Sequence, residues 1–362
     1  MVKSIKEEIY IKETIYMSIS FSGAKKYKKH NGFSKSARIK TPLPSPIHFY
    51  SLHQGRNILL QPTVKKGERI LLGQKIADLN SFDAIPVLSS VSGRVVSITA
   101  DMISVENDML MDQYPYAPPD KSYDTLTTRE LLWILRESAV CEVRSGIPVH
   151  VLLSCEKTPE CVIVCCFDSD PYVSSLQAAA AGNAEKILKG LSIVLRTLGI
   201  KKAVIGVEND TKKIYSDFKY HLRYNTDISL YSLKARYPQS RSDILVKTLT
   251  GKSIDAINTV ILSSETLCNI ANVLESGQPV TDKIVTVSGD DILPPNNYLV
   301  PTGAPIASLL TNSGYTSPSI VVNGGITDGR RITDLDEPIT GITKAIIAFN
   351  NKNNIPRYAK IH

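Results

Sequence analysis

Acidic residues follow two apolar segments of this 362-residue chain and are its best candidates for binding chemistry. Asp168 and Asp170 come directly after the apolar run 161–167, and Glu208 ends the run 202–208. If both runs are strands of a parallel sheet, these carboxylates lie at its carboxyl edge, where such sheets bind ligands. Two interpretations stay open for the aspartates: capping of the following helix, or hydrogen bonding to ribose or ribityl hydroxyls of a nucleotide.

Cysteine is the second residue type that could carry chemistry. Five of the six cysteines fall between residues 141 and 166, in the order C-x13-C-x5-C-x3-C-C. Zinc sites and iron–sulfur clusters use closely spaced pairs or triplets such as C-x2-C, and this order contains none. Three of the cysteines lie in CVIVCC, an apolar run typical of a buried strand. We therefore expect structural thiols in a reducing compartment, and no metal site.

Nucleotide and nucleophile motifs are absent or incomplete. TLTGKS (248–253) ends like a phosphate-binding loop, but Val246 stands where the first glycine of G-x-x-x-x-G-K-[ST] belongs. G-x-G-x-x-G does not occur, and none of the six histidines is paired with a Ser or Cys in a known nucleophile motif. His150 alternates with apolar residues, which favours a structural imidazole in a strand or loop. We assign no catalytic residue.

Charge and hydropathy limit the class of protein. Residues 1–40 hold ten Lys and Arg and three Glu, so their surplus equals the whole formal charge of +7. We expect a solvated basic arm there, with contact to an anionic surface or an acidic partner as the alternative. The lack of a basic–aromatic array argues against specific nucleic-acid binding. No segment approaches the roughly 18 continuous apolar residues of a membrane helix, and residues 1–18 lack the apolar core of a secretory signal.

Residues 41–105 have the pattern of a barrel of short strands. V-x-x-G-x-x-I-x-x-G-Q-x-I-A is followed by P-V-x-S-x-V-S-G-x-V, with turn signals at Gly67, Gly73 and Gly93. These two halves resemble the flattened barrel of biotinyl and lipoyl modules. In carrier versions a lysine at the hairpin between the halves holds the cofactor, but no Lys occurs from 76 to 120. We therefore expect a structural barrel-sandwich hybrid.

Helices and strands alternate after this barrel, which predicts a Rossmann-like α/β domain with a mostly parallel, two-sided sheet over residues 125–280. Thr127 and Glu130 form a capping-box pattern. Gly199 is placed to end a long helix that begins at Ser175.

The C-terminal part of the chain has a different rhythm. Residues 281–325 follow the order strand–strand–helix–strand, which favours a smaller β-grasp module. We expect residues 326–362 to form a C-terminal tail, whose last part, KAIIAFNNKNNIPRYAKIH (344–362), becomes polar and frays. The predicted fold class is therefore α/β, with a barrel-sandwich hybrid before the parallel domain and a β-grasp module after it.

The order of these motifs resembles the C subunit of the Rnf electron-transport complex, a family similar to the flavin- and NADH-binding subunit of respiratory complex I. The resemblance runs from about residue 30 to 350, and it extends to the Rnf-like proteins associated with proline reductase. Its most specific segment is ESGQPVTDKIVTVSGDDILPPNNYLVPTGAPIASLL (275–310). VKKGERILLGQKIADL, DSDPYVSS, VENDTKK and VVNGGITDGR also lie in the family's order.

The resemblance implies FMN and NADH as ligands of the central domain and a β-grasp module of the soluble-ligand-binding type. It also implies a C-terminal ferredoxin-like segment with two four-iron clusters, but this sequence lacks the cysteines of that segment. We therefore expect no iron–sulfur cluster in this chain and a separate iron–sulfur or membrane-bound subunit as its partner. The implied location is cytoplasmic, on the inner face of the cell membrane through partners.

The loop that binds flavin in that family is altered here. The family's G-x-G-G-A-G-F-P-T-x-x-K reads CEVRSGIPVHVLL, which keeps Gly146 and Pro148 and has Leu152 in place of the lysine. Glycines let backbone N–H groups approach phosphate and flavin closely, so side chains at 142–145 make the site degenerate. We expect Arg144 to replace the lysine as a phosphate partner.

The resemblance implies cofactor-binding roles for seven residues: Arg144, Gly146, Pro148, Asp168, Asp170, Glu208 and Thr266. Gly146 and Pro148 would shape the loop over the phosphate or isoalloxazine, and the two aspartates would bind ribityl or nicotinamide-ribose hydroxyls. Glu208 would lie across the same crevice, and Thr266 would contact phosphate. The leading functional hypothesis is electron transfer from NADH through FMN to a separate acceptor. A scaffold or regulatory relative without cofactors and a small-ligand-binding protein remain as alternatives.

Overall fold

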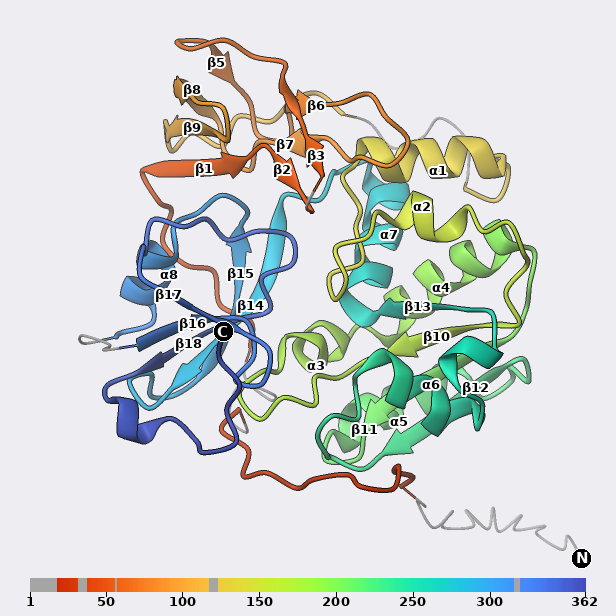
Figure 1. Ribbon diagram of the computed structural model, residues 1–362. Helices are drawn as coiled ribbons and strands as arrows, with labels where there is room; N and C mark the ends of the chain where they lie inside the picture. The colour runs from red at the N-terminus through yellow and green to blue at the C-terminus, as the bar shows by residue number, and fades with distance from the viewer. Residues whose placement is uncertain (1–17, 32–37, 56, 117–122, 316–319) are drawn as a thin grey trace, which may run out of the picture.

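The computed structural model describes residues 18–31, 38–55, 57–116, 123–315 and 320–362, which form three modules (Figure 1). The N-terminal barrel lies at the top of the view, the α/β module at the right and the C-terminal sheet at the left. Part of the expected basic arm, residues 1–17 and 32–37, lies outside the described residues.

The N-terminal module is a flattened barrel of short strands, as the sequence predicts. Gly67 and Gly73 both have φ of +85°, so each turn uses a backbone conformation that glycine adopts without strain. Its sheets have the orders β1-β9-β8-β5, β4-β6-β7 and β2-β3. The strands are β1 (Ile47–Ser51), β2 (His53–Gln54), β3 (Ile58–Leu59), β4 (Gln61–Pro62), β5 (Arg69–Ile70), β6 (Lys75–Asp78), β7 (Val87–Leu88), β8 (Gly93–Ile98) and β9 (Met102–Asn107).

The central module contains a fully parallel four-stranded sheet in the order β12-β11-β10-β13. The chain steps outward from β10 to β11 and β12, then returns to place β13 on the other side of β10. Its strands are β10 (Cys161–Cys165), β11 (Ala203–Glu208), β12 (Ile228–Leu233) and β13 (Thr259–Ser263). Its helices are α1 (Thr128–Glu137), α2 (Val149–Leu153), α3 (Ser175–Ala180), α4 (Ala184–Leu198), α5 (Lys212–His221), α6 (Ser242–Thr250), the 3-10 turn η1 (Ile254–Ala256) and α7 (Ser264–Ser276).

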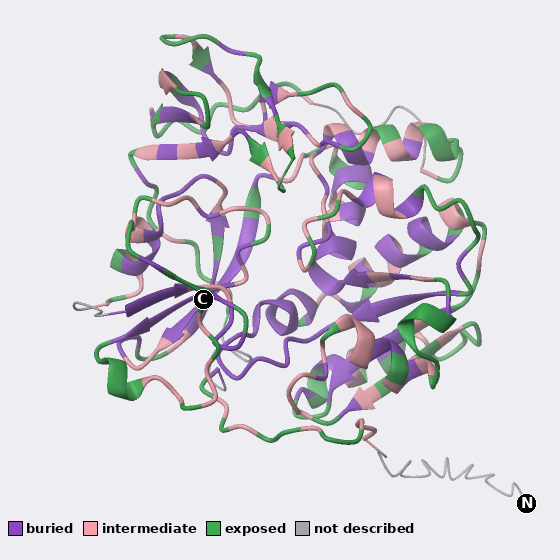
Figure 2. Ribbon diagram, in the orientation of Figure 1, coloured by how far each residue is buried: buried purple, intermediate pink, exposed green. Residues whose placement is uncertain are grey.

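Alternate strand residues pack on opposite faces of this sheet, and both faces are covered (Figure 2). One face packs Val162 and Val164 of β10 in a core with α1, α2, α4, α5 and α7. The other face packs Ile163 and Cys165 against α6. α4 and α7 approach so closely that a Cβ added at Gly190 would lie 2.1 Å from the Leu267 carbonyl oxygen. This close packing fixes the first turn of α7 against α4.

Local signals in this module are confirmed where they concern helix ends. Thr127 and Glu130 form the capping box of α1, and Gly199 ends α4 in the left-handed conformation. The single helix expected from Ser175 is wrong, because the chain breaks between α3 and α4 at Gly182, which has φ of +75°. His150 lies in the short helix α2 rather than in a strand or loop.

The C-terminal module is a mixed five-stranded sheet in the order β15-β14-β18-β16-β17 with one helix. The expectation of a tail over 326–362 is wrong for β17 and β18, and the fraying expected over 344–362 is wrong for β18. Strand β18 is fully buried and pairs with both β14 and β16, because its apolar run completes the centre of the sheet. The elements are β14 (Asp282–Gly289), β15 (Asn296–Pro301), α8 (Ile306–Asn312), β16 (Ile320–Asn323), β17 (Arg330–Ile332), β18 (Ala345–Phe349) and the 3-10 turn η2 (Lys352–Asn354).

Residues 18–31 form a strap that runs below the α/β and C-terminal modules in Figure 1. Ile19 bridges to Leu233 at the end of β12, and Lys25 bridges to Tyr237. Farther along, the ring of Tyr27 stacks on that of Tyr358 with centroids 3.9 Å apart. The part of the expected basic arm that the structure describes is therefore packed on the body of the protein.

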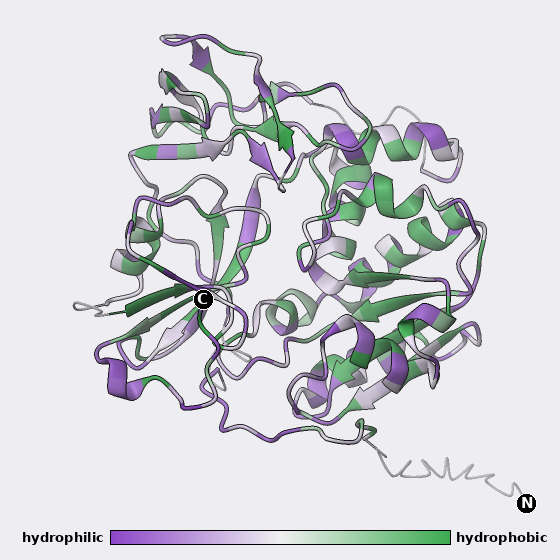
Figure 3. Cartoon of the chain, viewed as in Figure 1, coloured by the Kyte–Doolittle hydropathy of each residue, from purple (hydrophilic) through white to green (hydrophobic). Residues whose placement is uncertain are grey.

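Apolar residues gather in the strands of both large sheets and on the inner faces of the helices (Figure 3). Within the described ranges, none of the helices combines the length and the hydropathy needed to cross a bilayer.

Candidate functional site

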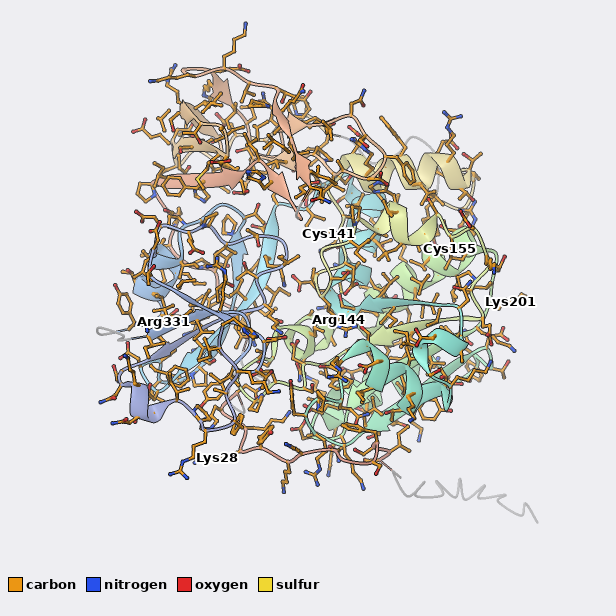
Figure 4. All side chains as sticks on the ribbon, viewed as in Figure 1. Lys28, Cys141, Arg144, Cys155, Lys201 and Arg331 are labelled. Carbon is orange, nitrogen blue, oxygen red and sulfur yellow. The ribbon has the colours of Figure 1, made fainter. Side chains whose placement is uncertain are left out.

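The topology of the parallel sheet places a crevice at the carboxyl ends of β10 and β13. The strand order reverses between these neighbouring strands, because β11 and β12 lie on one side of β10 and β13 lies on the other, and α/β sheets bind ligands where the order reverses. Three segments meet there: the loop 141–148, the segment 167–175 after β10, and the start of α7. The labelled side chains of Cys141 and Arg144 belong to the first of these segments (Figure 4).

A cavity of about 290 Å³, which we call the crevice cavity, lies at this edge. Arg144, Asp168 and Asp170 line it from the α/β module. The C-terminal module contributes Thr327 and Lys344 to the opposite wall. Three of the seven predicted binding residues are thus brought together, and the cavity, which is lined mostly by polar and charged residues, is shared by two modules.

Asp168 holds the beginning of α3. Its Oδ2 accepts hydrogen bonds from the Leu176 N–H at 2.9 Å and the Ser175 hydroxyl at 3.2 Å. Its Oδ1 takes part in no hydrogen bond with the described residues. Asp168 therefore bonds the first turn of α3 as the capping interpretation expects, although Ser174 is the N-cap residue and Asp170 does not bond this helix. Ligand binding through Oδ1 stays a prediction.

Asp170 joins the α/β module to the C-terminal module. Its Oδ1 accepts from the Tyr172 N–H at 2.9 Å, and its Oδ2 accepts from the Thr327 hydroxyl at 2.8 Å and the Thr327 N–H at 3.2 Å. Burial raises the pKa of Asp170 above its ordinary value. A Cβ at Gly325 would lie 2.6 Å from Oδ2, so the glycine permits this close approach.

Arg144 is the cation of the crevice cavity that lacks a carboxylate partner within the described chain. Its Nη2 donates to the Ser240 carbonyl. The other cations that line the cavity are paired: Arg241 with Asp243 at 2.7 Å, Lys344 with Asp328 at 2.6 Å, and Lys283 with Glu265 at 2.5 Å. Arg144 can therefore bind an anionic ligand without first breaking an ion pair, whereas the other three cations cannot.

Glu142 points its carboxylate at the start of α7. Oε2 accepts from the Ser263 N–H at 2.9 Å and the Ser263 hydroxyl at 3.3 Å, while Oε1 accepts from the Arg144 N–H at 3.2 Å. Thr266, fully buried, accepts through Oγ1 from the Val143 N–H at 3.2 Å. A phosphate at this position would bind to Thr266 and to the N-terminus of α7. Both are already hydrogen-bonded to the loop 141–148.

Glu208 lies at the carboxyl end of β11 and is fully buried. It accepts from the Lys29 ammonium of the strap at 2.5 Å and from Gln177 Nε2 at 3.3 Å. Gln177 also bonds both backbone groups of Asp168, which links Glu208 to the crevice. The structure places Glu208 outside the residues that line the crevice cavity, and Lys29 of the strap bonds its carboxylate.

Gly146 and Pro148 line a second cavity, of about 620 Å³. We call it the junction cavity, because residues from all three modules line it. Val143 and Lys283 line both cavities, so they form the wall between them. The predicted loop residues are therefore divided, with Arg144 on one side of this wall and Gly146 and Pro148 on the other.

The ion pair of Lys283 and Glu265 was missed by the sequence reasoning. Glu265 lies in the first turn of α7 and Lys283 in β14, and their side chains are 4% and 2% exposed. Glu265 Oε1 also accepts from the Ile284 N–H at 2.9 Å. No local signal marks this pair, because Lys283 reads as an ordinary polar residue at the start of a strand.

The six cysteines are free thiols, and four of them are buried. No group of three His, Cys, Asp or Glu side chains suited to a metal ion occurs within the described residues. Burial and the nearby Glu142 carboxylate raise the pKa of Cys141 to about 12, and burial raises that of Cys268 to about 12. Thiols with such raised pKa values are poor nucleophiles at neutral pH.

Two family models match the chain in its first two modules. Residues 139–275 match the Nuo51 FMN-binding domain, and residues 19–111 match the RnfC barrel-sandwich hybrid domain. The class of protein is thus an FMN-binding type α/β domain that follows a barrel-sandwich hybrid module.

Curated relatives agree with this assignment over most of the chain. The C subunit of the proton-translocating ferredoxin:NAD(+) oxidoreductase complex of Clostridium ljungdahlii is 25% identical over 87% of this chain and 72% of its own length. The C subunit of the Na(+)-translocating complex of Acetobacterium woodii is 25% identical over 84% of this chain and 72% of its own. Over most of its length the chain is similar to Rnf complex C subunits, and its N-terminal module matches the RnfC domain model.

A solved structure shares the fold. The crystal structure of an NAD+-reducing [NiFe]-hydrogenase in the air-oxidized state superposes with a TM-score of 0.52 at 17% sequence identity. The match covers 63% of this chain and 47% of that chain, and at this identity it establishes the fold alone.

Proposed function

We propose that this protein transfers electrons from NADH through FMN to a separate acceptor, as an Rnf C-subunit-like electron-transfer protein. One coincidence carries the proposal: the segment that matches the FMN-binding domain, 139–275, also supplies most of the lining of the crevice cavity. The names of the relatives, ferredoxin:NAD(+) oxidoreductase subunits, support the same reaction class.

The residues of the crevice fit part of an FMN molecule. Arg144 supplies a cation for the phosphate, and the free Oδ1 of Asp168 can accept from a ribityl hydroxyl. The cavity of about 290 Å³ lies at the lower limit of ordinary ligand pockets, about 300–1,000 Å³. Binding of a whole flavin therefore requires the loop 142–146 to shift. FMN, when bound, supplies the chemistry of taking a hydride and releasing single electrons.

The proposed partner is a separate iron–sulfur or membrane-bound subunit, which would place the protein in the cytoplasm at the inner face of the membrane. We propose no iron–sulfur cluster in this chain. The C-terminal sheet is proposed as a β-grasp module of the soluble-ligand-binding type. Its hairpin, its helix and its central last strand, parallel to the first, support that assignment.

A flavin titration tests the proposal. The purified protein is titrated with FMN, and quenching of flavin fluorescence gives the affinity; NADH is then added without oxygen to bleach the flavin absorbance. We expect Arg144→Ala to weaken FMN at least tenfold, because a charge-assisted hydrogen bond contributes about 1.5–3 kcal/mol. Arg241→Ala, at a paired cation of the same cavity, is the matched control. Equal FMN affinity in the wild type and Arg144→Ala would contradict the assigned role.

A second candidate function is a scaffold or regulatory relative that has lost its cofactors. The internal bonding of Glu142 and Thr266 at the start of α7 favours it, because the loop occupies the donors that a phosphate would need. Failure of the wild-type protein to bind FMN, together with no thermal stabilisation by NADH, would support this function instead.

A further inference from the structure

The junction cavity has the size and position of a binding site, but the proposed reaction does not use it. Its volume of about 620 Å³ lies in the middle of the range for ligand pockets, and it lies where three modules meet. Strands β1–β3 form one wall, the loop after α1 the second, and β14 with the loop 338–342 the third.

The walls of this cavity are mainly apolar. Ile147 and Ile342 are 41% and 55% exposed although they belong to its lining, so they present apolar surface to the opening. A Cβ at Gly146 would lie 3.1 Å from the Ile342 side chain, so the two sides approach closely there. Further apolar lining comes from Phe49, Ile58, Ile85, Val87, Pro148 and Val280.

Two polar side chains in the cavity lack partners within the described chain. Asp282 takes part in no side-chain hydrogen bond or ion pair with described residues, and neither does Asn269 on α7. Asp282 is exposed, yet the surrounding protein raises its pKa by desolvation, as expected of a carboxylate inside a cavity. The ammonium of Lys283 does not offset this charge, because it is bonded to Glu265 at 2.5 Å.

We infer that the junction cavity binds a planar heteroaromatic ligand that carries a positive charge and no phosphate. The apolar walls fit the faces of a ring system, Asp282 fits a cationic or N–H edge, and Asn269 supplies a further amide contact. A phosphate is excluded, because the carboxylates of Asp282 and Asp83 in the lining would repel it. Lys283 does not offset this repulsion, since it is paired with Glu265, and the described lining offers no unpaired cation. This site is therefore separate from the crevice cavity, where Arg144 lies.

Ligand binding here should stabilise the protein as a whole. Residues of all three modules line the cavity, so a bound ligand contacts each of them and binds only when they are assembled. A ligand that binds the folded state alone raises the unfolding temperature in proportion to the logarithm of its concentration.

Two fluorescent probes of opposite charge test this inference. Proflavine is planar and cationic, and 1-anilinonaphthalene-8-sulfonate (ANS) is apolar and anionic; each is titrated into the full chain. We expect saturable binding of proflavine with a rise in unfolding temperature. Asp282→Asn should weaken proflavine at least tenfold while leaving ANS no weaker. Asp255→Asn, at an exposed carboxylate in η1, is the matched control and should bind proflavine as the wild type does.

Two outcomes would overturn the inference. If Asp282→Asn binds proflavine as tightly as the wild type, the carboxylate does not recognise the cation. If saturating FMN or NADH displaces proflavine in competition, the junction cavity is part of the nucleotide site. A failure to bind FMN at all leaves the proflavine result unaffected, so the proposed function and this inference are judged separately.

Discussion

Removal of either member of the buried Lys283–Glu265 pair should destabilise the junction between α7 and β14. Both side chains are almost fully buried, and the ammonium keeps only the Ile284 carbonyl, at 2.8 Å, when the carboxylate is lost. Leaving one buried charge without its partner costs about 3–5 kcal/mol. We therefore expect Glu265→Gln and Lys283→Met each to lower the free energy of unfolding by that amount.

The double variant separates the pair from the rest of the core. In Lys283→Met/Glu265→Gln no unpaired charge remains, and the amide oxygen still accepts from the Ile284 N–H, which Glu265 holds at 2.9 Å. We expect the double variant to recover more than half of the loss. Urea unfolding followed by circular dichroism gives the free energies, and Trp133 fluorescence follows the α/β module.

An exposed pair provides the control for this measurement. Lys252 and Glu160 are 2.7 Å apart with side chains 50% and 51% exposed, so Lys252→Met should cost less than about 1 kcal/mol. Single variants at the buried pair that lose no more than this control, or a double variant as unstable as the sum of the singles, would refute the reasoning.

Two further predictions concern pH and packing. His48 is buried with neither ring nitrogen hydrogen-bonded to the described residues, and desolvation lowers its pKa from 6.5 to about 4. Folding favours the neutral ring, so the stability that depends on it is complete above pH 6.5 and falls by about 3 kcal/mol as the pH drops toward 4. We expect the urea midpoint of the wild type to be lower at pH 4.5 than at pH 7, and this difference to shrink in His48→Leu. A His48→Leu variant with the pH dependence of the wild type would contradict the assignment. Gly190→Ala places a Cβ 2.1 Å from the Leu267 carbonyl oxygen, so α4 and α7 must separate; we expect a loss of about 1–3 kcal/mol in urea unfolding. Gly341→Ala, whose Cβ would meet the Cys141 sulfur at an ordinary contact distance of 3.4 Å, should lose less.

Local sequence signals predicted the elements better than their ends and partners. The alternation of apolar runs with helices located the strands of the parallel sheet, and the capping box and Gly199 located two helix boundaries. These features depend on nearest neighbours along the chain. The break at Gly182 and the central place of β18 depend on packing between segments that are distant in the chain. Local patterns in one sequence do not reveal such packing.

The candidate site was predicted in part for the same reason. Asp168 and Asp170 were expected at a strand end and do line the crevice cavity, because strand direction and topology decide that position. Glu208 and Thr266 were expected at the ligand, but the strap and the loop 141–148 engage them. Such internal partners follow from tertiary contacts that no local spacing signals, and the same holds for Lys283, Glu265 and Asp282.

The stacked rings of Tyr27 and Tyr358 bring the first and last described segments of the chain together. His30 lies on Tyr172 with ring centroids 4.4 Å apart, so the aromatic contacts extend to the segment after β10. The two outermost parts of the chain are therefore mutually dependent. A fusion, tag or cleavage that pulls one of them away also uncovers the other, and displacement of the strap takes the Lys29 ammonium away from Glu208.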